Sequence, residues 1–432
     1  MFGSSGIRGV ANREITPQLG LAFGNAIGSI YPEVMIAHDP RIAGEMIENA
    51  VVSGLLSAGS KVIKAGMVPT PTLALASKKY GCGIMITASH NPAKYIGMKV
   101  FKDGMSFDSA QQKEIEQIMK EGNFKYADWE KTGHLRETGK AINEHKEIIL
   151  KKTGRSSLKV VVDCGCGAAS VITPYVLREM GCEVLTLNAQ PDGFFPGREP
   201  EPLEETLSLL KSACIASGAD LGIAHDGDAD RMMAVDNKGR FVSGDKMLAF
   251  FAIREARNAI AVPVDTSRVI DDMLVGIKIS HTKVGDVYVA EALKKINGDF
   301  GGEPSGAWIF PEISFCPDGI YAAARLVEIL EKEGEFSGLL EAIPEYPVKR
   351  GAFPCRDKNK AMVKITEKIK GLGNINTLDG VRVDLKDGWI LVRPSGTEPK
   401  IRITVESKER CDDLFNTAEN IVRGAIESIT HT

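Results

Sequence analysis

Short apolar runs alternate with helical stretches along the first part of the chain. Runs at residues 33–38, 61–65 and 83–88 are short and bounded by polar or turn residues, as buried β-strands are. Strands separated by helices in this way are typical of a parallel sheet with crossover helices. A charged, helix-prone stretch follows Lys99, and the polar segment 151–157 predicts a linker. We therefore expect the first domain to end near residue 150.

The same pattern returns twice more along the chain. A strand at 158–163 opens a second unit, whose strand at 220–225 runs directly into an acidic loop. A third unit contains a strand at 260–264. These patterns predict α/β domains at residues 1–150, 151–243 and 244–347.

The last part of the chain has a different pattern. Apolar and polar residues alternate at 380–385, 389–393 and 401–406, as in half-buried antiparallel strands, and a helix is expected from about residue 412 to 429. Residues 348–432 thus predict an α+β domain. The expected fold class is α/β, with three similar α/β domains with mixed sheets plus a smaller C-terminal α+β domain around a central cleft.

The composition of the chain argues against nucleic acid and membranes as binding partners. The 432 residues suffice for several domains with cores of their own. A net charge of −4 argues against nucleic acid, because phosphate backbones are bound by clustered Lys and Arg. No apolar run approaches the roughly 18 residues of a membrane span, and the N-terminus lacks the layout of a secretory signal. We expect a cytoplasmic protein with no membrane partner, whose eight scattered cysteines stay reduced.

A serine follows the strand predicted at 83–88. The loop reads Thr87-Ala-Ser-His-Asn-Pro92, in which Ser89 can present its hydroxyl to a cleft and His90 offers a polar contact. Taken alone, the loop also fits an ordinary polar turn. A Ser-His-Asp hydrolase is the nearest alternative, but its serine usually lies in a G-x-S-x-G elbow, which is not evident here.

Three carboxylates follow the strand at 220–225. The loop Asp226-Gly-Asp-Ala-Asp-Arg231 places Asp226, Asp228 and Asp230 at alternate positions, where they can turn towards one point. Oxygen ligands suit Mg²⁺, which keeps positions open for water or phosphate oxygens. An EF-hand would need Gly at the sixth position and Glu at the twelfth, where this chain has Arg and Asn.

Two further loops carry groups suited to sugars and phosphates. In Gly301-Gly-Glu-Pro-Ser-Gly306, Glu303 and Ser305 can hydrogen-bond sugar hydroxyls. Residues 393–400, Arg-Pro-Ser-Gly-Thr-Glu-Pro-Lys, combine a fixed cation, two hydroxyls and a glycine, as a small phosphate cradle needs. Each of the four loops follows a predicted strand, and ligands of open α/β sheets bind beyond the carboxyl ends of the strands. We expect the four loops to converge on one site.

In their order and spacing, these loops resemble those of the α-D-phosphohexomutase superfamily along the whole chain. Residues 87–92 with 226–231 are close to diagnostic, and segments 2–9, 39–41 and 66–72 look like further signatures. The resemblance implies an isomerase in which phosphorylated Ser89 gives its phosphoryl group to a hexose phosphate. The bisphosphorylated sugar then reorients and returns its other phosphate, so that phosphate moves between C1 and C6.

The resemblance also implies roles for single residues. Ser89 and the three aspartates would hold one Mg²⁺, and the metal, Arg8 and Arg231 would supply positive charge around Ser89. Lys99 matches a lysine thought to assist proton transfer, with a pKa that burial beside cations would lower, while His90 would act similarly or orient the loop. The expected substrate contacts are Arg231, Lys283, Glu303 and Ser305, together with the phosphate-gripping residues Arg393, Ser395, Gly396 and Thr397.

Two positions depart from the superfamily pattern. Ala307 stands where many relatives have His, so any contact of that His with the sugar ring is absent or supplied elsewhere. Ile96 precedes Gly97 where relatives often have Asn, which would change hydrogen bonding near Lys99.

The first and fourth loops look more like those of phosphoglucosamine mutases than of phosphomannomutases, and the third resembles archaeal members. This implies conversion of glucosamine 6-phosphate to glucosamine 1-phosphate for UDP-N-acetylglucosamine synthesis, with a hexose 1,6-bisphosphate as activator, in a monomer or homodimer. Phosphomannomutase, phosphoglucomutase and phosphopentomutase activities stay open, since the sugar contacts are few. The alternatives from other classes are a metal-dependent phosphatase or kinase with an aspartyl nucleophile within 226–228, and a sugar-phosphate sensor without turnover.

Overall fold

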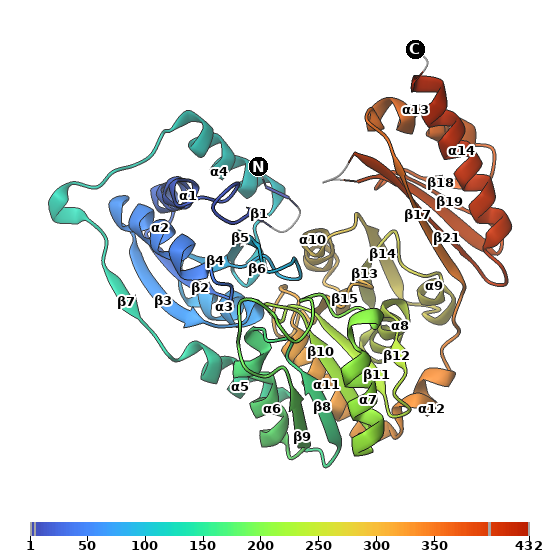
Figure 1. Ribbon diagram of the computed structural model, residues 1–432, viewed down its shortest axis with the longest axis horizontal. Helices are drawn as coiled ribbons and strands as arrows, with labels where there is room; N and C mark the ends of the chain where they lie inside the picture. Colours follow the sequence, from blue (N-terminus) through green and yellow to red (C-terminus); the bar gives the residue numbers. More distant parts are fainter. Residues whose placement is uncertain (1, 4–5, 396–398, 431–432) are drawn as a thin grey trace.

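The chain folds into four β-sheets that follow one another along the sequence (Figure 1). The computed structural model describes residues 2–3, 6–395 and 399–430. The first three sheets are mixed and flanked by helices, and the last is antiparallel with helices on one side, which confirms the predicted fold class. All eight cysteines are free thiols. Among the described residues, no helix is both long and apolar enough to cross a bilayer.

The first sheet has the strand order β1-β5-β4-β2-β3-β7, with β6 paired to β5. Its parallel part, β4-β2-β3-β7, matches the predicted crossover pattern, whereas β1, β5 and β6 pair in the antiparallel sense. Strand β5 runs back beside β4 because the loop between them is too short for a crossover helix. The elements are β1 (Ile7–Val10), β2 (Glu33–His38), β3 (Lys61–Met67), β4 (Cys82–Ile86), β5 (Tyr95–Lys102), β6 (Met105–Ser106), β7 (Leu135–Glu137), α1 (Pro17–Ile30), α2 (Gly44–Ser57), α3 (Thr70–Ala76), α4 (Ser109–Glu121) and α5 (Ala141–Lys152).

Strand β2 is buried on both faces, which explains its unbroken apolar sequence. Val34 and Ile36 pack in the core formed with α1 and α2, and Met35 and Ala37 pack in the core on the side of α3. A half-exposed strand would instead alternate polar and apolar residues.

The second sheet has the order β12-β11-β10-β8-β9, and the third has the order β14-β13-β15-β16. The second contains β8 (Lys159–Asp163), β9 (Glu183–Leu187), β10 (Leu221–His225), β11 (Met232–Asp236) and β12 (Phe241–Val242), with α6 (Thr173–Met180) and α7 (Ser208–Ser217). The third contains β13 (Ala259–Pro263), β14 (Lys278–Thr282), β15 (Phe300–Gly302) and β16 (Trp308–Ile309), with α8 (Gly244–Glu255), α9 (Val269–Met273) and α10 (Asp286–Ile296), and is followed by α11 (Gly319–Glu333) and α12 (Phe336–Glu341).

The second and third units share one hydrophobic core. A single buried cluster extends from Val160 and Ile223 of the second sheet to Phe300 and Trp308 of the third. Helix α11 follows the third sheet in sequence but contacts α6, β10 and β11 of the second. These two units are therefore packed as one body, at the bottom and centre of Figure 1.

The last sheet has the order β17-β21-β20-β19-β18, in which every pairing is antiparallel. Alternate residues such as Val381, Val383 and Ile390 face the core with the two helices, as the alternating pattern predicts. On the opposite face, Trp389 and Leu391 pack on Val264 of the third unit. The elements are β17 (Val348–Pro354), β18 (Asn374–Asn376), β19 (Val381–Asp384), β20 (Gly388–Pro394), β21 (Lys400–Ser407), α13 (Lys358–Ile369) and α14 (Asp412–Thr430).

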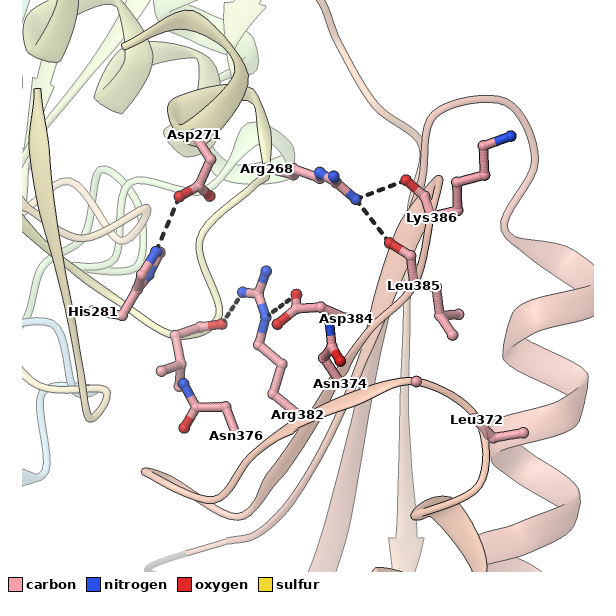
Figure 2. Close-up of a pocket in the computed structure, with 12 residues that line it drawn as sticks. Arg268, Asp271, His281, Leu372, Asn374, Asn376, Arg382, Asp384, Leu385 and Lys386 are labelled. Atoms are coloured by element: carbon pink, nitrogen blue, oxygen red, sulfur yellow. Dashed lines mark hydrogen bonds and ion pairs between the residues drawn. The ribbon is translucent and has the colours of Figure 1, made fainter. Parts of the chain in front are cut away.

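Two arginines also connect the last sheet to the third unit (Figure 2). Arg268 donates hydrogen bonds of 2.9 Å to the carbonyl oxygens of both Leu385 and Lys386. Arg382 donates in the reverse direction, to the carbonyl oxygen of Val264. The two side chains border a cavity of about 510 Å³ between the units. The last domain is thus attached through a small apolar contact and a few polar bonds, without a shared core.

Candidate active site

Ser89 lies in the loop that follows β4. Its hydroxyl points at residues 226–231 of the next unit, the loop with the three aspartates, which we call the metal loop. Ser89 Oγ donates a hydrogen bond of 2.8 Å to Asp226 Oδ2. The backbone of Ser89 is left-handed, with φ 52°, a conformation that costs energy for a residue with a side chain. Gly227 makes the close approach possible, because a Cβ there would lie 2.7 Å from the Ser89 carbonyl oxygen.

The three predicted aspartates converge directly after β10. One carboxylate oxygen from each of Asp226, Asp228 and Asp230 lies within 4.8 Å of the other two, and all three residues are buried. Asp228 Oδ1 and Asp230 Oδ1 are buried without a hydrogen-bond partner among the described residues. Buried carboxylate oxygens normally have a partner, so these atoms fit the coordination of a hard divalent cation.

The pKa values of the aspartates are shifted in different directions by burial and by neighbouring charges. Burial, followed by repulsion from Asp230 and Asp228, raises the pKa of Asp226 well above its ordinary value. Burial also acts against ionisation of Asp228, but the charge and hydrogen bond of Lys99 outweigh it, so the pKa of Asp228 is lowered. A cation bound between the carboxylates would favour the ionised form of all three.

Lys99 projects from β5 into the same cluster. Its Nζ lies 2.8 Å from Asp228 Oδ2 and 2.6 Å from Asp230 Oδ2. The expected lowering of its pKa is wrong for this arrangement. Burial does act to lower the pKa of Lys99, but Asp228 and Asp230 reverse the effect and raise it. Lys99 is therefore a positive charge held within the aspartate cluster to which the Ser89 hydroxyl also donates.

An arginine and a histidine also lie at the serine loop. Arg8 of β1 lies opposite Gly97 of β5, and its Nη1 donates to Asn91 Oδ1 at 3.3 Å. His90 Nδ1 lies 3.4 Å from Ser89 Oγ. Burial, together with the charges of Arg231 and Arg8, lowers the pKa of His90 to about 2. His90 is thus a neutral neighbour of the serine hydroxyl.

The predicted sugar loop lies beside the metal loop. Arg231 and Ala307 form an antiparallel bridge that joins the two loops. Glu303 Oε1 accepts a hydrogen bond of 2.7 Å from the Gly285 backbone, and Ser305 Oγ lies 3.5 Å from the other Glu303 oxygen. Burial, with repulsion from nearby aspartates, raises the pKa of Glu303 to about 7. Lys283 is exposed at the end of β14, with its Nζ 5.8 Å from the centre of the Tyr288 ring.

The predicted phosphate loop approaches from the last domain. Arg393 Nη1 lies 2.9 Å from Asp379 Oδ2, and the same oxygen accepts from the Val284 backbone at 3.2 Å. Ser395 is buried, and its carbonyl oxygen accepts a hydrogen bond of 2.5 Å from Lys358 Nζ. Gly396 and Thr397 lie outside the described residues. The structure thus brings Arg393 next to the segment that follows Lys283.

Thr70, to which sequence reasoning gave no individual role, also contacts the metal loop. Thr70 Oγ1 donates to Asp228 Oδ2 at 2.5 Å, and its backbone N–H donates to the Asp228 carbonyl oxygen at 2.9 Å. The signal for it is a threonine between Pro69 and Pro71 at a helix start directly after an apolar strand. That pattern indicates a loop at the end of a strand, like the four loops with candidate site residues. It does not indicate that Thr70 contacts Asp228.

A serine hydroxyl beside three buried carboxylates and a buried lysine is an arrangement that suits metal-dependent phosphoryl transfer. Four models of the phosphoglucomutase/phosphomannomutase family match the chain, for α/β/α domains I, II and III at residues 1–126, 140–239 and 243–346, and for the C-terminal domain at residues 352–421. The chain belongs to this family, which confirms the resemblance to the α-D-phosphohexomutases. It is accordingly a hexose-phosphate mutase, an isomerase.

The chain is similar to curated archaeal proteins over its full length. It is 55% identical to the probable phosphoglucosamine mutase of Methanococcoides burtonii, over 99% of both chains. It is also 55% identical to the protein of the same name from Methanosarcina barkeri, over 99% of this chain and all of that one. A crystal structure of a phosphoglucomutase/phosphomannomutase family protein from Burkholderia thailandensis has a TM-score of 0.87 and 27% identity, covering 99% of this chain and 98% of the other. A metal ion belongs in the active site of this family, and the three aspartates can bind it.

Proposed function

We propose that the protein interconverts glucosamine 6-phosphate and glucosamine 1-phosphate, through a phosphoserine at Ser89 and a bisphosphorylated sugar. The observation that carries the proposal is the position of Ser89 Oγ, 2.8 Å from Asp226 in a cluster of three buried aspartates, two of which contact Lys99. The choice of the amino sugar rests on the archaeal relatives named as probable phosphoglucosamine mutases.

The residues around Ser89 fit one Mg²⁺, held by Asp226, Asp228, Asp230 and an oxygen on Ser89. When bound, Mg²⁺ would neutralise negative charge on the phosphoryl group during transfer. Lys99 adds a second positive charge at the same point, and its proton is held between Asp228 and Asp230. With a pKa of about 2, His90 would be too weak a base to take the Ser89 hydroxyl proton, and that hydroxyl donates its hydrogen bond to Asp226.

The substrate would lie across the second, third and fourth loops. Arg231 would neutralise the phosphate nearest Ser89, and Glu303 and Ser305 would accept and donate hydrogen bonds with the sugar hydroxyls. Lys283, Arg393 and Ser395, with Gly396 and Thr397, would hold the phosphate that does not react. A hexose 1,6-bisphosphate would phosphorylate Ser89 at the start of catalysis.

Turnover measurements test substrate and nucleophile together. Glucosamine 6-phosphate, glucose 1-phosphate, mannose 1-phosphate and ribose 1-phosphate are each assayed with Mg²⁺ and a trace of the matching bisphosphate. We expect preference for the amino sugar and loss of turnover in Ser89→Ala, with full activity in the control Ser212→Ala, an exposed serine of α7. Preference for another sugar would overturn the substrate, and full activity of Ser89→Ala would overturn the mechanism.

The site of covalent labelling separates this mechanism from an aspartyl nucleophile. A radiolabelled bisphosphate should label the wild-type protein and the Asp226→Asn variant on Ser89, the latter more slowly, and should not label Ser89→Ala. Labelling of Ser89→Ala that disappears in Asp226→Asn would show that the aspartate is the phosphorylated residue.

A further inference from the structure

Arg41 is a buried arginine whose donors are directed at the backbone of the serine loop. It lies just after β2, and its side chain has no exposed surface. Its Nη2 donates to the carbonyl oxygens of Ser89 at 2.7 Å and Asn91 at 2.6 Å. Its Nη1 donates to those of Pro92 at 2.8 Å and Tyr95 at 3.0 Å. One guanidinium therefore holds three carbonyl groups of the serine loop and that of Tyr95, the first residue of β5.

The loop needs these bonds because it turns sharply between two strands. Among the described residues, the carbonyl oxygens of Ser89 and Asn91 accept no backbone hydrogen bond, whereas that of Pro92 also accepts from the Tyr95 N–H. Arg41 therefore supplies the partners that the carbonyl groups of Ser89 and Asn91 would otherwise lack. A planar guanidinium has five N–H donors in a fixed arrangement, and such a group can orient several acceptors at once. Arg41 thus favours a loop conformation that includes the left-handed backbone of Ser89.

A second set of bonds fixes the other side of Ser89. Arg41 Nε donates to Asp39 Oδ2 at 3.0 Å, and the same oxygen accepts from Thr87 Oγ1 at 2.6 Å. Thr87 Oγ1 in turn accepts from the Ser89 backbone N–H at 2.8 Å. The N–H and the carbonyl of Ser89 are therefore both connected to Arg41.

The second unit packs directly on this arginine. The ring of Phe195 lies over the Arg41 guanidinium, 5.1 Å from its centre. Gly193 approaches so closely that a Cβ there would lie 2.4 Å from the Pro40 carbonyl oxygen. Because the second unit also carries Asp226, Arg41 links the element that bears the nucleophile to the body that bears the metal ligands.

We propose that Arg41 is a positioning residue for phosphoryl transfer, which places Ser89 Oγ against Asp226 without touching the substrate. The inference rests on the proposed role of Ser89. A displacement of about 1 Å of a reacting group can slow a reaction about 100-fold. Arg41→Met should therefore lower kcat roughly 100-fold, while KM for the sugar phosphate changes less than about threefold, because the substrate loops on the third and fourth units are unaffected.

The experiment compares Arg41→Met, Arg41→Lys and Arg155→Met in the full chain. Arg155 is exposed and serves as the control for loss of an arginine. Steady-state kcat and KM are measured with Mg²⁺, and the rate of Ser89 phosphorylation by glucose 1,6-bisphosphate is followed in a single turnover. Lysine, with three donors, should recover part of the phosphorylation rate, and Arg155→Met should match the wild type.

The outcomes distinguish the inference from the proposed function. Unchanged kcat in folded Arg41→Met, or a fall in kcat accompanied by an equal rise in KM, would overturn the positioning role while Ser89→Ala remains inactive. Full activity of Ser89→Ala would instead overturn the proposed function and the inference with it.

Thr87→Val provides a second test if Arg41→Met does not fold. It removes the acceptor of the Ser89 N–H but keeps Arg41, so it breaks the hydrogen-bonded path from Arg41 through Asp39 and Thr87 to Ser89. It should show the same lower kcat with an unchanged KM, and wild-type kcat in Thr87→Val would count against the inference.

Discussion

At the scale of single residues, Lys99 balances part of the negative charge of the aspartates. It contacts Asp228 and Asp230 in a buried cluster, so its removal leaves two carboxylates without their counter-ion. Breaking a buried ion pair in this way costs about 3–5 kcal/mol. Lys99→Met should therefore lower the melting temperature of the metal-free protein.

Magnesium should recover more stability in Lys99→Met than in the wild type, because the cation supplies the missing charge. The measurement is thermal unfolding with EDTA and with Mg²⁺, and the control is Lys151→Met, an exposed lysine at the end of α5. Equal Mg²⁺ shifts in wild type and Lys99→Met would show that the lysine and the metal act independently.

Glu303 gives a second prediction for a single residue, on how the stability of the protein depends on pH. Burial, with repulsion from Asp286 and Asp265, raises its pKa from 4.5 to about 7. The folded state holds this proton more tightly than the unfolded chain, so the contribution of Glu303 to stability is complete below pH 4.5 and falls as pH rises to about 7. The loss amounts to roughly 3 kcal/mol.

Glu303→Gln stays neutral and keeps an oxygen for the Gly285 N–H. Its melting temperature, relative to wild type, should therefore be higher at pH 8 than at pH 5. Glu199→Gln, at an exposed glutamate, should show no such change. A constant difference between Glu303→Gln and wild type across this pH range would contradict the raised pKa.

At the scale of elements, a buried chain of hydrogen bonds joins three helices behind the metal loop. Thr72 Oγ1 of α3 lies 2.8 Å from His145 Nδ1 of α5, and His145 Nε2 lies 2.9 Å from Asp318 Oδ2. Asp318 is the N-cap of α11, and the next residue, Gly319, donates its N–H to the Ala229 carbonyl of the metal loop. These hydrogen bonds therefore hold the first turns of α3 and α11 against the loop that carries the aspartates.

His145→Phe should destabilise the protein, because it leaves the buried Thr72 hydroxyl and the buried Asp318 Oδ2 atom without the histidine, at about 1–3 kcal/mol each. Thermal unfolding should show the loss, and amide hydrogen exchange should accelerate at the first turn of α11 more than in β20 of the last domain. His134→Phe, at an exposed histidine, is the control. Uniform exchange changes in α11 and β20 would show that the histidine stabilises the molecule only globally.

The sequence predicts individual strands better than the way distant segments pair. Strand β2 occupies residues 33–38 as predicted, because apolar runs and turn residues are local signals. The packing of α11 on the second sheet depends on contacts between segments about 100 residues apart, which no local pattern encodes. Similarly, the sequence predicts Ser89 and Asp226 because their side chains form recognisable loop motifs. It does not predict the contacts of Arg41, because Arg41 binds backbone carbonyl oxygens, which every residue possesses.

At the scale of the whole molecule, we expect the last domain to move relative to the other three units. The second and third units share a core, whereas the last domain meets the third unit through a small apolar cluster and through hydrogen bonds and ion pairs, among them those of Arg268, Arg382 and Asp379. Figure 2 shows the bonds of the two arginines. In the proposed mechanism, the phosphate loop would hold the substrate and then release the bisphosphate for reorientation. Solution scattering should therefore show a smaller radius of gyration with a saturating bisphosphate. Equal profiles with and without it would argue against domain closure.

Asp379 should control how tightly the phosphate loop binds. Its Oδ2 pairs with Arg393 and accepts from the Val284 backbone, so a substrate phosphate must compete with it for the arginine. The pair is partly exposed, and such pairs are worth up to about 1 kcal/mol. Asp379→Asn removes the competing charge and should lower the Kd for the sugar phosphate by up to about fivefold, measured by calorimetry. Asp387→Asn, at an exposed aspartate of the same domain, should leave Kd unchanged. Weaker binding in Asp379→Asn would show that the carboxylate orients Arg393 for phosphate and does not compete with it.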